Sequence, residues 1–121
     1  MSLTVLAVDD SKTMRDLLHC ALAAEGFDVC LAVDGEDGLA QLGKLVPHVI
    51  ITDINMPKLD GFGFIEGVRE RSALHGVPIL VLTTESDPEL KQRARAAGAT
   101  GWIVKPFDPE RLVAAIRRVA C

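Results

Sequence analysis

Residues 4–10 read TVLAVDD, an apolar run that ends abruptly on two adjacent carboxylates, Asp9 and Asp10. The run is continuously hydrophobic, which is typical of a parallel strand covered on both faces. Adjacent carboxylates repel each other, and removing them from water at the edge of a core is costly. The stretch therefore predicts an α/β fold with a functional group at the end of its first strand.

Five short apolar runs rich in Val, Ile and Leu recur along the chain, at residues 3–8, 29–33, 49–52, 78–82 and 101–104. The segments between these runs have the spacing of apolar residues that is typical of amphipathic helices. In the first segment, the residues that share one helix face are Met14, Leu17, Leu18, Ala21 and Leu22. Gly26 can end that helix. The helical pattern is weaker at about residues 35–45, where glycines interrupt it. A further helix is indicated by an apolar stripe that begins with Phe64, Ile65 and Val68.

The last two helices have the same predicted start, SDPE at 86–89 and FDPE at 107–110. Each motif places Asp at the N-cap, Pro at the first helical position and Glu in the first turn. Five strands alternating with five helices predict a (βα)₅ doubly wound, five-stranded parallel sheet with helices on both faces. Ligands bind such sheets beyond the carboxyl ends of the strands.

Length and composition exclude several classes of protein. A chain of 121 residues suits a single domain with a sizeable core. A net charge of −4 and a pI near 5.3 argue against nucleic-acid binding. No apolar run approaches the ~20 residues that cross a bilayer. The three cysteines, at 20, 30 and 121, have no metal-ligand spacing and follow no signal peptide, so we expect buried thiols in a soluble, cytoplasmic protein.

Four of the five predicted strands deliver polar side chains to the same edge of the sheet, namely Asp9, Asp10, Asp53, Thr83, Thr84 and Lys105. Three carboxylates about 5 Å apart would repel by roughly 3 kcal/mol per pair at an effective dielectric of ~20. Such oxygen ligands suit Mg²⁺ or Mn²⁺. Lys105 and Thr83 could stabilise charge on a phosphoryl oxygen, while one carboxylate acts as a nucleophile towards phosphorus.

At these positions the sequence resembles the receiver domains of bacterial two-component response regulators. The motifs that carry the resemblance are VDDS at 8–11, DINMPKLDG at 53–61, LTTE at 82–85 and KPF at 105–107. They occur in the family's order and span the chain, so the resemblance implies one receiver domain over residues 1–121 with no output domain. It also implies a flavodoxin-like, CheY-like sheet with strand order 2-1-3-4-5.

The resemblance implies that Asp53 accepts a phosphoryl group from a phosphohistidine of a CheA-like sensor histidine kinase. It implies Mg²⁺ ligands from the three carboxylates Asp9, Asp10 and Asp53 and from the backbone carbonyl of Asn55. The resulting aspartyl phosphate is a mixed anhydride that hydrolyses readily, so the modification is a timed signal.

The resemblance also implies that Thr83 and Lys105 bind the phosphoryl oxygens. It implies in addition that the Lys105–Pro106 peptide bond is cis. Trp102 stands three residues before the lysine, where the family often has Tyr or Phe. This aromatic side chain is implied to swing inward when Thr83 is drawn to the phosphoryl group, and half-buried packing is the alternative. The motion would change a docking face formed by the helix at 88–97, the strand at 101–104 and the last helix.

Three neighbouring polar residues are expected to tune self-dephosphorylation. By the same likeness, Asn55 and Glu85 flank the path of the attacking water. Thr84 stands where the family commonly has Ala or Gly, and we expect its methyl group to narrow access to Asp53 and slow phosphoryl exchange.

The resemblance predicts a monomeric signalling protein, not an enzyme acting on a metabolite, with chemotaxis as the setting and a flagellar motor switch protein as the partner. A phosphate sink and a phosphorelay shuttle are alternatives within the class. A Mg²⁺-dependent phosphatase with an aspartyl nucleophile is less favoured, because that class has a second Asp where Asn55 stands. A receiver fold that binds partners without phosphorylation is disfavoured by the complete acidic set and Lys105.

Overall fold

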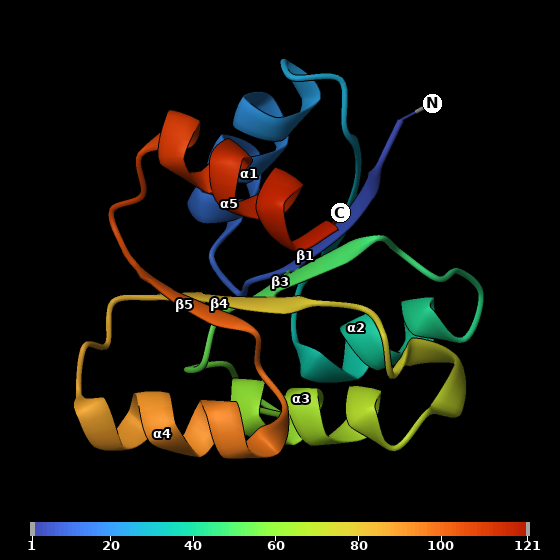
Figure 1. Cartoon of the computed structure of the whole chain (residues 1–121), viewed down its shortest axis with the longest axis vertical. Coiled ribbons are helices and arrows are strands. Elements are labelled where there is room, and N and C mark those ends of the chain that lie inside the picture. Colours follow the sequence, from blue (N-terminus) through green and yellow to red (C-terminus); the bar gives the residue numbers. More distant parts are fainter. Residues whose placement is uncertain (1, 121) are drawn as a thin grey trace.

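Five parallel strands form one sheet in the order β2-β1-β3-β4-β5 (Figure 1). The computed structural model describes residues 2–120. Its strands are β1 (Thr4–Val8), β2 (Asp28–Ala32), β3 (Val49–Thr52), β4 (Ile79–Thr83) and β5 (Gly101–Val104). Its helices are α1 (Lys12–Ala23), α2 (Gly35–Leu42), α3 (Gly61–Arg69), α4 (Pro88–Ala97) and α5 (Pro109–Ala120), with the short 3₁₀ helix η1 (Ser72–Leu74). The predicted fold and strand order are confirmed.

The sheet lies between two layers of helices, with α1 and α5 on one face and α2, α3 and α4 on the other (Figure 1). Alternate residues of β1 enter the two cores: Val5 and Ala7 pack with α1 and α5, whereas Leu6 and Val8 pack on the opposite side. Both sets are buried, which explains why the strand reads as continuously apolar.

Each predicted strand boundary lies within one residue of the observed one. The two predicted caps are present as well. The Asp87 carboxylate accepts a hydrogen bond from the backbone N–H of Glu89 at 2.9 Å, and Asp108 accepts one from Glu110 at 3.0 Å. These side chains satisfy backbone donors at the helix starts that have no intrahelical partner.

Two helix predictions need correction. The apolar face predicted for α1 is too wide, because Leu18 and Leu22 are buried but Leu17 is 52% exposed. The sheet and α5 cover only a narrow stripe of this helix. The segment predicted at 35–45 ends as α2 at Leu42, where Gly43 follows as the C-cap.

The cysteine prediction was wrong in part. Cys20 is exposed on the solvent side of α1 and Cys30 in β2 is only partly buried, while position 121 lies outside the described residues. Between residues 2 and 120, no helix combines the length and apolar character needed to span a membrane.

Candidate functional site

Three carboxylates meet beyond the carboxyl ends of β1 and β3. Val8 and Thr52 are register partners in these neighbouring strands, so the next residues, Asp9 and Asp53, lie side by side. Carboxylate oxygens of these two residues and of Asp10 all lie within 4.8 Å of one another. Asp9 and Asp53 are 2% and 8% exposed, whereas Asp10 is exposed.

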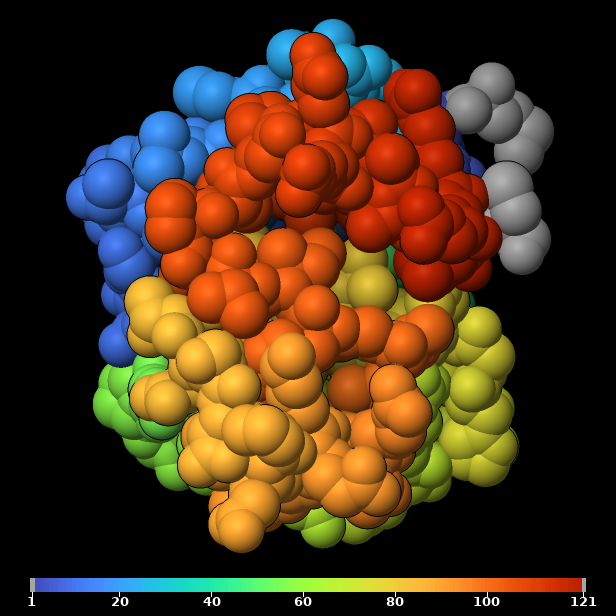
Figure 2. Space-filling view, turned by 60° about the vertical axis from the view of Figure 1, so that its left-hand side comes forward, coloured from blue at the N-terminus to red at the C-terminus, as the bar shows by residue number. Residues whose placement is uncertain are grey.

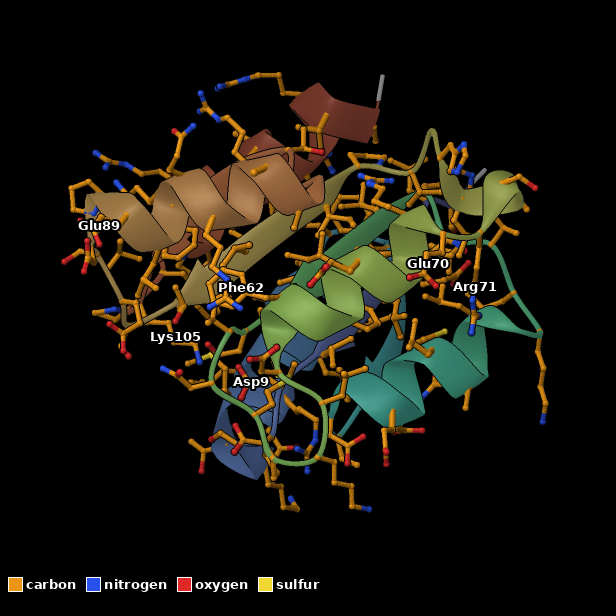
Figure 3. All side chains as sticks on the ribbon, turned by 90° about the horizontal axis from the view of Figure 1, so that it is seen from below. Asp9, Phe62, Glu70, Arg71, Glu89 and Lys105 are labelled. Atoms are coloured by element: carbon orange, nitrogen blue, oxygen red, sulfur yellow. The ribbon has the colours of Figure 1, made fainter. Side chains whose placement is uncertain are left out.

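Lys105 supplies the positive charge within this cluster. Its Nζ donates hydrogen bonds to Oδ2 of Asp9 and to Oδ2 of Asp53, each at 2.8 Å. In Figure 3, Lys105 and Asp9 lie close together at one edge of the sheet. Burial alone would lower the pKa of Lys105, but the hydrogen bonds to Asp53 and Asp9 and their negative charges raise it overall. The Lys105–Pro106 peptide bond is cis.

Backbone amides hold the remaining oxygens of the two buried carboxylates. Oδ1 of Asp53 accepts a hydrogen bond from the N–H of Ile54 at 2.6 Å. Oδ1 of Asp9 accepts one from the N–H of Ser11 at 2.9 Å. Each buried carboxylate is thus fixed through both oxygens, and the pair is oriented before any ligand binds.

The loop after β4 carries a second group of interactions, centred on Glu85. The fully buried hydroxyl of Thr83 accepts a hydrogen bond from the N–H of Glu85 at 3.3 Å. The Glu85 carboxylate accepts one from the side-chain amide of Asn55 at 3.1 Å, and its carbonyl accepts one from the indole N–H of Trp102 at 3.0 Å. Glu85 therefore joins three of the predicted site residues, and Thr84 beside it is exposed.

Trp102 has intermediate burial and packs against the core on the side of α4. Next to it, β5 and α5 border a groove of about 490 Å³, lined by residues that include Trp102, Val104, Phe107, Arg111 and Arg118. Figure 2 shows this side of the molecule, with α5 above and α4 below. The part of the predicted docking face between β5 and α5 is thus hollowed, and the groove begins at the aromatic side chain that contacts Glu85.

Sequence reasoning missed one contact with the acidic cluster, made by Arg15, and one ion pair outside the cluster, between Asp34 and Lys58. Arg15 donates from Nη1 to the carbonyl oxygen of Asp9 at 2.7 Å. Asp34 is buried at the N-cap of α2, with its Oδ2 3.9 Å from Nζ of Lys58, which has a φ of 69°. An Asp directly before Gly35 is an N-cap signal that could have revealed Asp34. The contact of Arg15 has no comparable local signature.

Gly61 closes the loop that follows Asp53. Its N–H donates to the carbonyl oxygen of Ile54 at 2.8 Å. A Cβ at this position would overlap the carbonyl oxygen of Asp53 and lie 2.7 Å from Cα of Ile54. Only glycine allows the start of α3 to approach the backbone of the site this closely.

The donor set fits a divalent cation that prefers oxygen. Three carboxylate oxygens within 4.8 Å, two of them from buried and pre-oriented residues, are the ligands that Mg²⁺ or Mn²⁺ uses in proteins. The acidic cluster can therefore hold a metal ion next to the partly buried ammonium of Lys105.

Comparison with known proteins gives a consistent result. Residues 5–117 match the family model described as the response regulator receiver domain. The chain is 41% identical to a probable chemotaxis protein CheY of Rhizobium etli, over 95% of this chain and 90% of that protein. The structure of the chemotaxis protein CheY4 of Vibrio cholerae superposes with a TM-score of 0.94 at 47% identity, covering 98% of this chain and 99% of that one.

A second group of relatives is longer. The chain is 39% identical to a probable transcriptional regulator, ycf27 of Porphyridium aerugineum, over 95% of this chain. It spans 47% of the length of that relative. The similarity is thus to a module that occurs both in short chemotaxis proteins and within longer regulators.

Proposed function

Because the chain belongs to the response regulator receiver domain family, we propose that it is a switch activated by phosphorylation of Asp53. The observation that carries the proposal is the contact of Lys105 with both Asp9 and Asp53 in an acidic cluster at the strand ends. Lys105 lies within hydrogen-bonding distance of Asp9 and Asp53, and a carboxylate oxygen of Asp10 lies within 4.8 Å of theirs, which supports roles for these groups as cation, nucleophile and metal ligands. Phosphoryl transfer depends mainly on such positioning and charge stabilisation.

In the proposed reaction, a carboxylate oxygen of Asp53 attacks the phosphorus of a phosphohistidine. The P–N bond breaks as the P–O bond forms, and the histidine leaves with the electron pair. Asp9, Asp10, Asp53 and the carbonyl of Asn55 would hold Mg²⁺ or Mn²⁺, which when bound neutralises charge on the phosphoryl oxygens. Water later hydrolyses the mixed anhydride and ends the signal.

Two residues of the site then bind the new group. The Lys105 ammonium, already on Oδ2 of Asp53, is placed to donate to a phosphoryl oxygen on that carboxylate. The Thr83 hydroxyl lies at the end of the neighbouring strand and can donate to another. In this proposal Asn55, Thr84 and Glu85 tune the loss of the phosphoryl group, and the hydrogen bond between Asn55 and Glu85 supports a shared role for these two residues.

The proposed output arises from the connection between Thr83 and Trp102. When the Thr83 hydroxyl turns to the phosphoryl group, the N–H of Glu85 loses its acceptor and the loop after β4 changes position. The indole of Trp102 follows the carbonyl of Glu85, to which it is hydrogen-bonded. The groove between β5 and α5 begins at Trp102, so its shape changes with the loop.

The setting we propose is chemotaxis in the cytoplasm, with a CheA-like sensor histidine kinase upstream and a flagellar motor switch protein downstream. Similarity to chemotaxis proteins along most of their length supports this setting. We propose that the chain acts as a single, monomeric receiver domain without an enzymatic activity on metabolites. A phosphate sink or a relay shuttle would use the same chemistry with a different partner.

The test is intact-mass spectrometry after incubation with acetyl phosphate, with Mg²⁺ or with a chelator. The wild type should gain one phosphoryl group only with Mg²⁺, and Asp53→Asn should gain none. Asp28→Asn is the matched control, because Asp28 is an exposed carboxylate at the opposite end of the strands and should leave the reaction unchanged. No gain in the wild type, or an equal gain in Asp53→Asn, would overturn the proposal.

A further inference from the structure

The loop that carries Asp9 and Asp10 is tied to α1 by one arginine. Nη1 of Arg15 donates to the carbonyl oxygen of Asp9 at 2.7 Å, and the backbone N–H of Arg15 donates to the carbonyl oxygen of Ser11 at 2.9 Å. Ser11 in turn donates its N–H to Oδ1 of Asp9. These three hydrogen bonds close a ring between the end of β1 and the first turns of α1.

The carbonyl that Arg15 binds belongs to the peptide unit between Asp9 and Asp10. Fixing that peptide fixes the direction in which both side chains leave the backbone. The two carboxylates repel each other and Asp53, so without a restraint the exposed Asp10 would turn towards water. A guanidinium is suited to the task because it stays charged and makes short, charge-assisted hydrogen bonds to oxygen.

We propose that Arg15 is a positioning residue for the divalent-cation site: by holding the Asp9–Asp10 peptide, it keeps both carboxylates converged with Asp53 and raises the affinity for Mg²⁺. The inference rests on the proposed function, since it concerns the same acidic cluster. Arg15 need not touch the metal ion or the phosphoryl group. Partners that orient ligands in this way commonly change metal affinity by about tenfold or more.

The direction in which Mg²⁺ affinity changes when Arg15 is removed distinguishes a positioning role from a purely electrostatic one. A cation close to a metal site repels Mg²⁺, so if Arg15 acted only through its charge, removing it would strengthen binding. If Arg15 acts by positioning, removing it weakens binding. Lys12 offers a matched control, because it is a cation on the same helix whose exposed side chain pairs with Asp16 and not with the loop.

The experiment is an NMR titration of the unphosphorylated protein with Mg²⁺ alone, on the wild type, Arg15→Met and Lys12→Met. We expect the wild type to bind, Arg15→Met to bind about tenfold more weakly, and Lys12→Met to bind as well as the wild type or slightly better. Core resonances in chelator report that each variant is folded. Arg15→Gln takes the place of Arg15→Met if the latter does not fold.

A second readout uses no metal. In chelator, the amide protons of Asp10 and Ser11 should exchange faster with solvent in Arg15→Met than in the wild type, because the loop has lost its restraint. Equal or tighter Mg²⁺ binding by a folded Arg15→Met would overturn the inference and leave the proposed function intact. Absence of Mg²⁺ binding by the wild type would instead overturn the proposed metal site, and the role of Arg15 with it.

Discussion

The indole N–H of Trp102 is hydrogen-bonded to the carbonyl oxygen of Glu85 at 3.0 Å, which ties β5 to the loop after β4. Trp102 therefore does more than fill space beside α4. Because Glu85 also contacts Thr83 and Asn55, this single hydrogen bond connects the loop after β4 with the groove beside α5.

Trp102→Phe should retain the aromatic ring but lose this hydrogen bond. The partly buried carbonyl of Glu85 would then lack its donor, at a cost of about 1 kcal/mol in the free energy of unfolding. Urea unfolding followed by circular dichroism measures the loss. If the two proteins unfold at the same urea concentration, the indole N–H does not hold the loop.

The contacts of Lys105 predict that the free energy of unfolding decreases at alkaline pH. Its pKa is raised in the folded state, because hydrogen bonds to Asp53 and Asp9 outweigh the effect of burial. A raised pKa means that the stabilisation by protonated Lys105 is fully present below its ordinary value of 10.5 and is lost as the pH rises through the higher folded value. The chain contains no tyrosine, so no phenol titrates in this range.

The measurement is the free energy of unfolding of wild type and Lys105→Met between about pH 7 and about pH 11. The difference between the two proteins should be constant up to about pH 10 and should shrink above it. Lys12→Met, which removes an exposed lysine, should show a smaller and flatter difference. A gap that stays constant to the alkaline limit would contradict the contact of Lys105 with the two carboxylates.

Gly61→Ala should destabilise the fold and impair the site together. The added Cβ would overlap the carbonyl oxygen of Asp53, so the loop behind this proposed phosphoacceptor must shift. We expect a loss of about 2 kcal/mol or more in unfolding free energy. Gly76→Ala is the control, since a Cβ there meets no heavy atom within 4 Å and should change stability by less than about 1 kcal/mol. Equal stability of the two variants would show that the loop at Gly61 can shift to accommodate a Cβ without loss of stability.

Thr84→Ala tests whether the exposed side chain that follows Thr83 limits phosphoryl exchange at Asp53. Removing the methyl group should raise the rates of phosphorylation and dephosphorylation together, each at least about twofold, equivalent to about 0.4 kcal/mol in the barrier. Thr84→Val retains the bulk and lacks the hydroxyl, so it should remain as slow as the wild type. The rates are followed by intact mass over time, and an alanine variant that is no faster would refute the idea.

Much of the fold could be predicted from local sequence patterns. The continuous hydrophobicity of β1, β3 and β4 indicated strands covered on both faces, and the Asp-Pro caps located the starts of α4 and α5. The strand order came from the resemblance of the motifs to a known family. The width of the apolar face of α1 could not be predicted, because only the packed sheet and α5 decide whether Leu17 is covered.

The chemical groups at the strand ends follow from the order of residues alone, because the carboxyl ends of parallel strands all lie on the same side of a sheet. The contacts among these groups depend instead on how the chain packs in three dimensions. Lys105 reaches Asp9 across 96 positions of the chain, and the indole of Trp102 in β5 meets the carbonyl oxygen of Glu85 in the loop after β4. Such pairings depend on loop paths and side-chain rotamers, which long-range packing selects and local sequence does not encode.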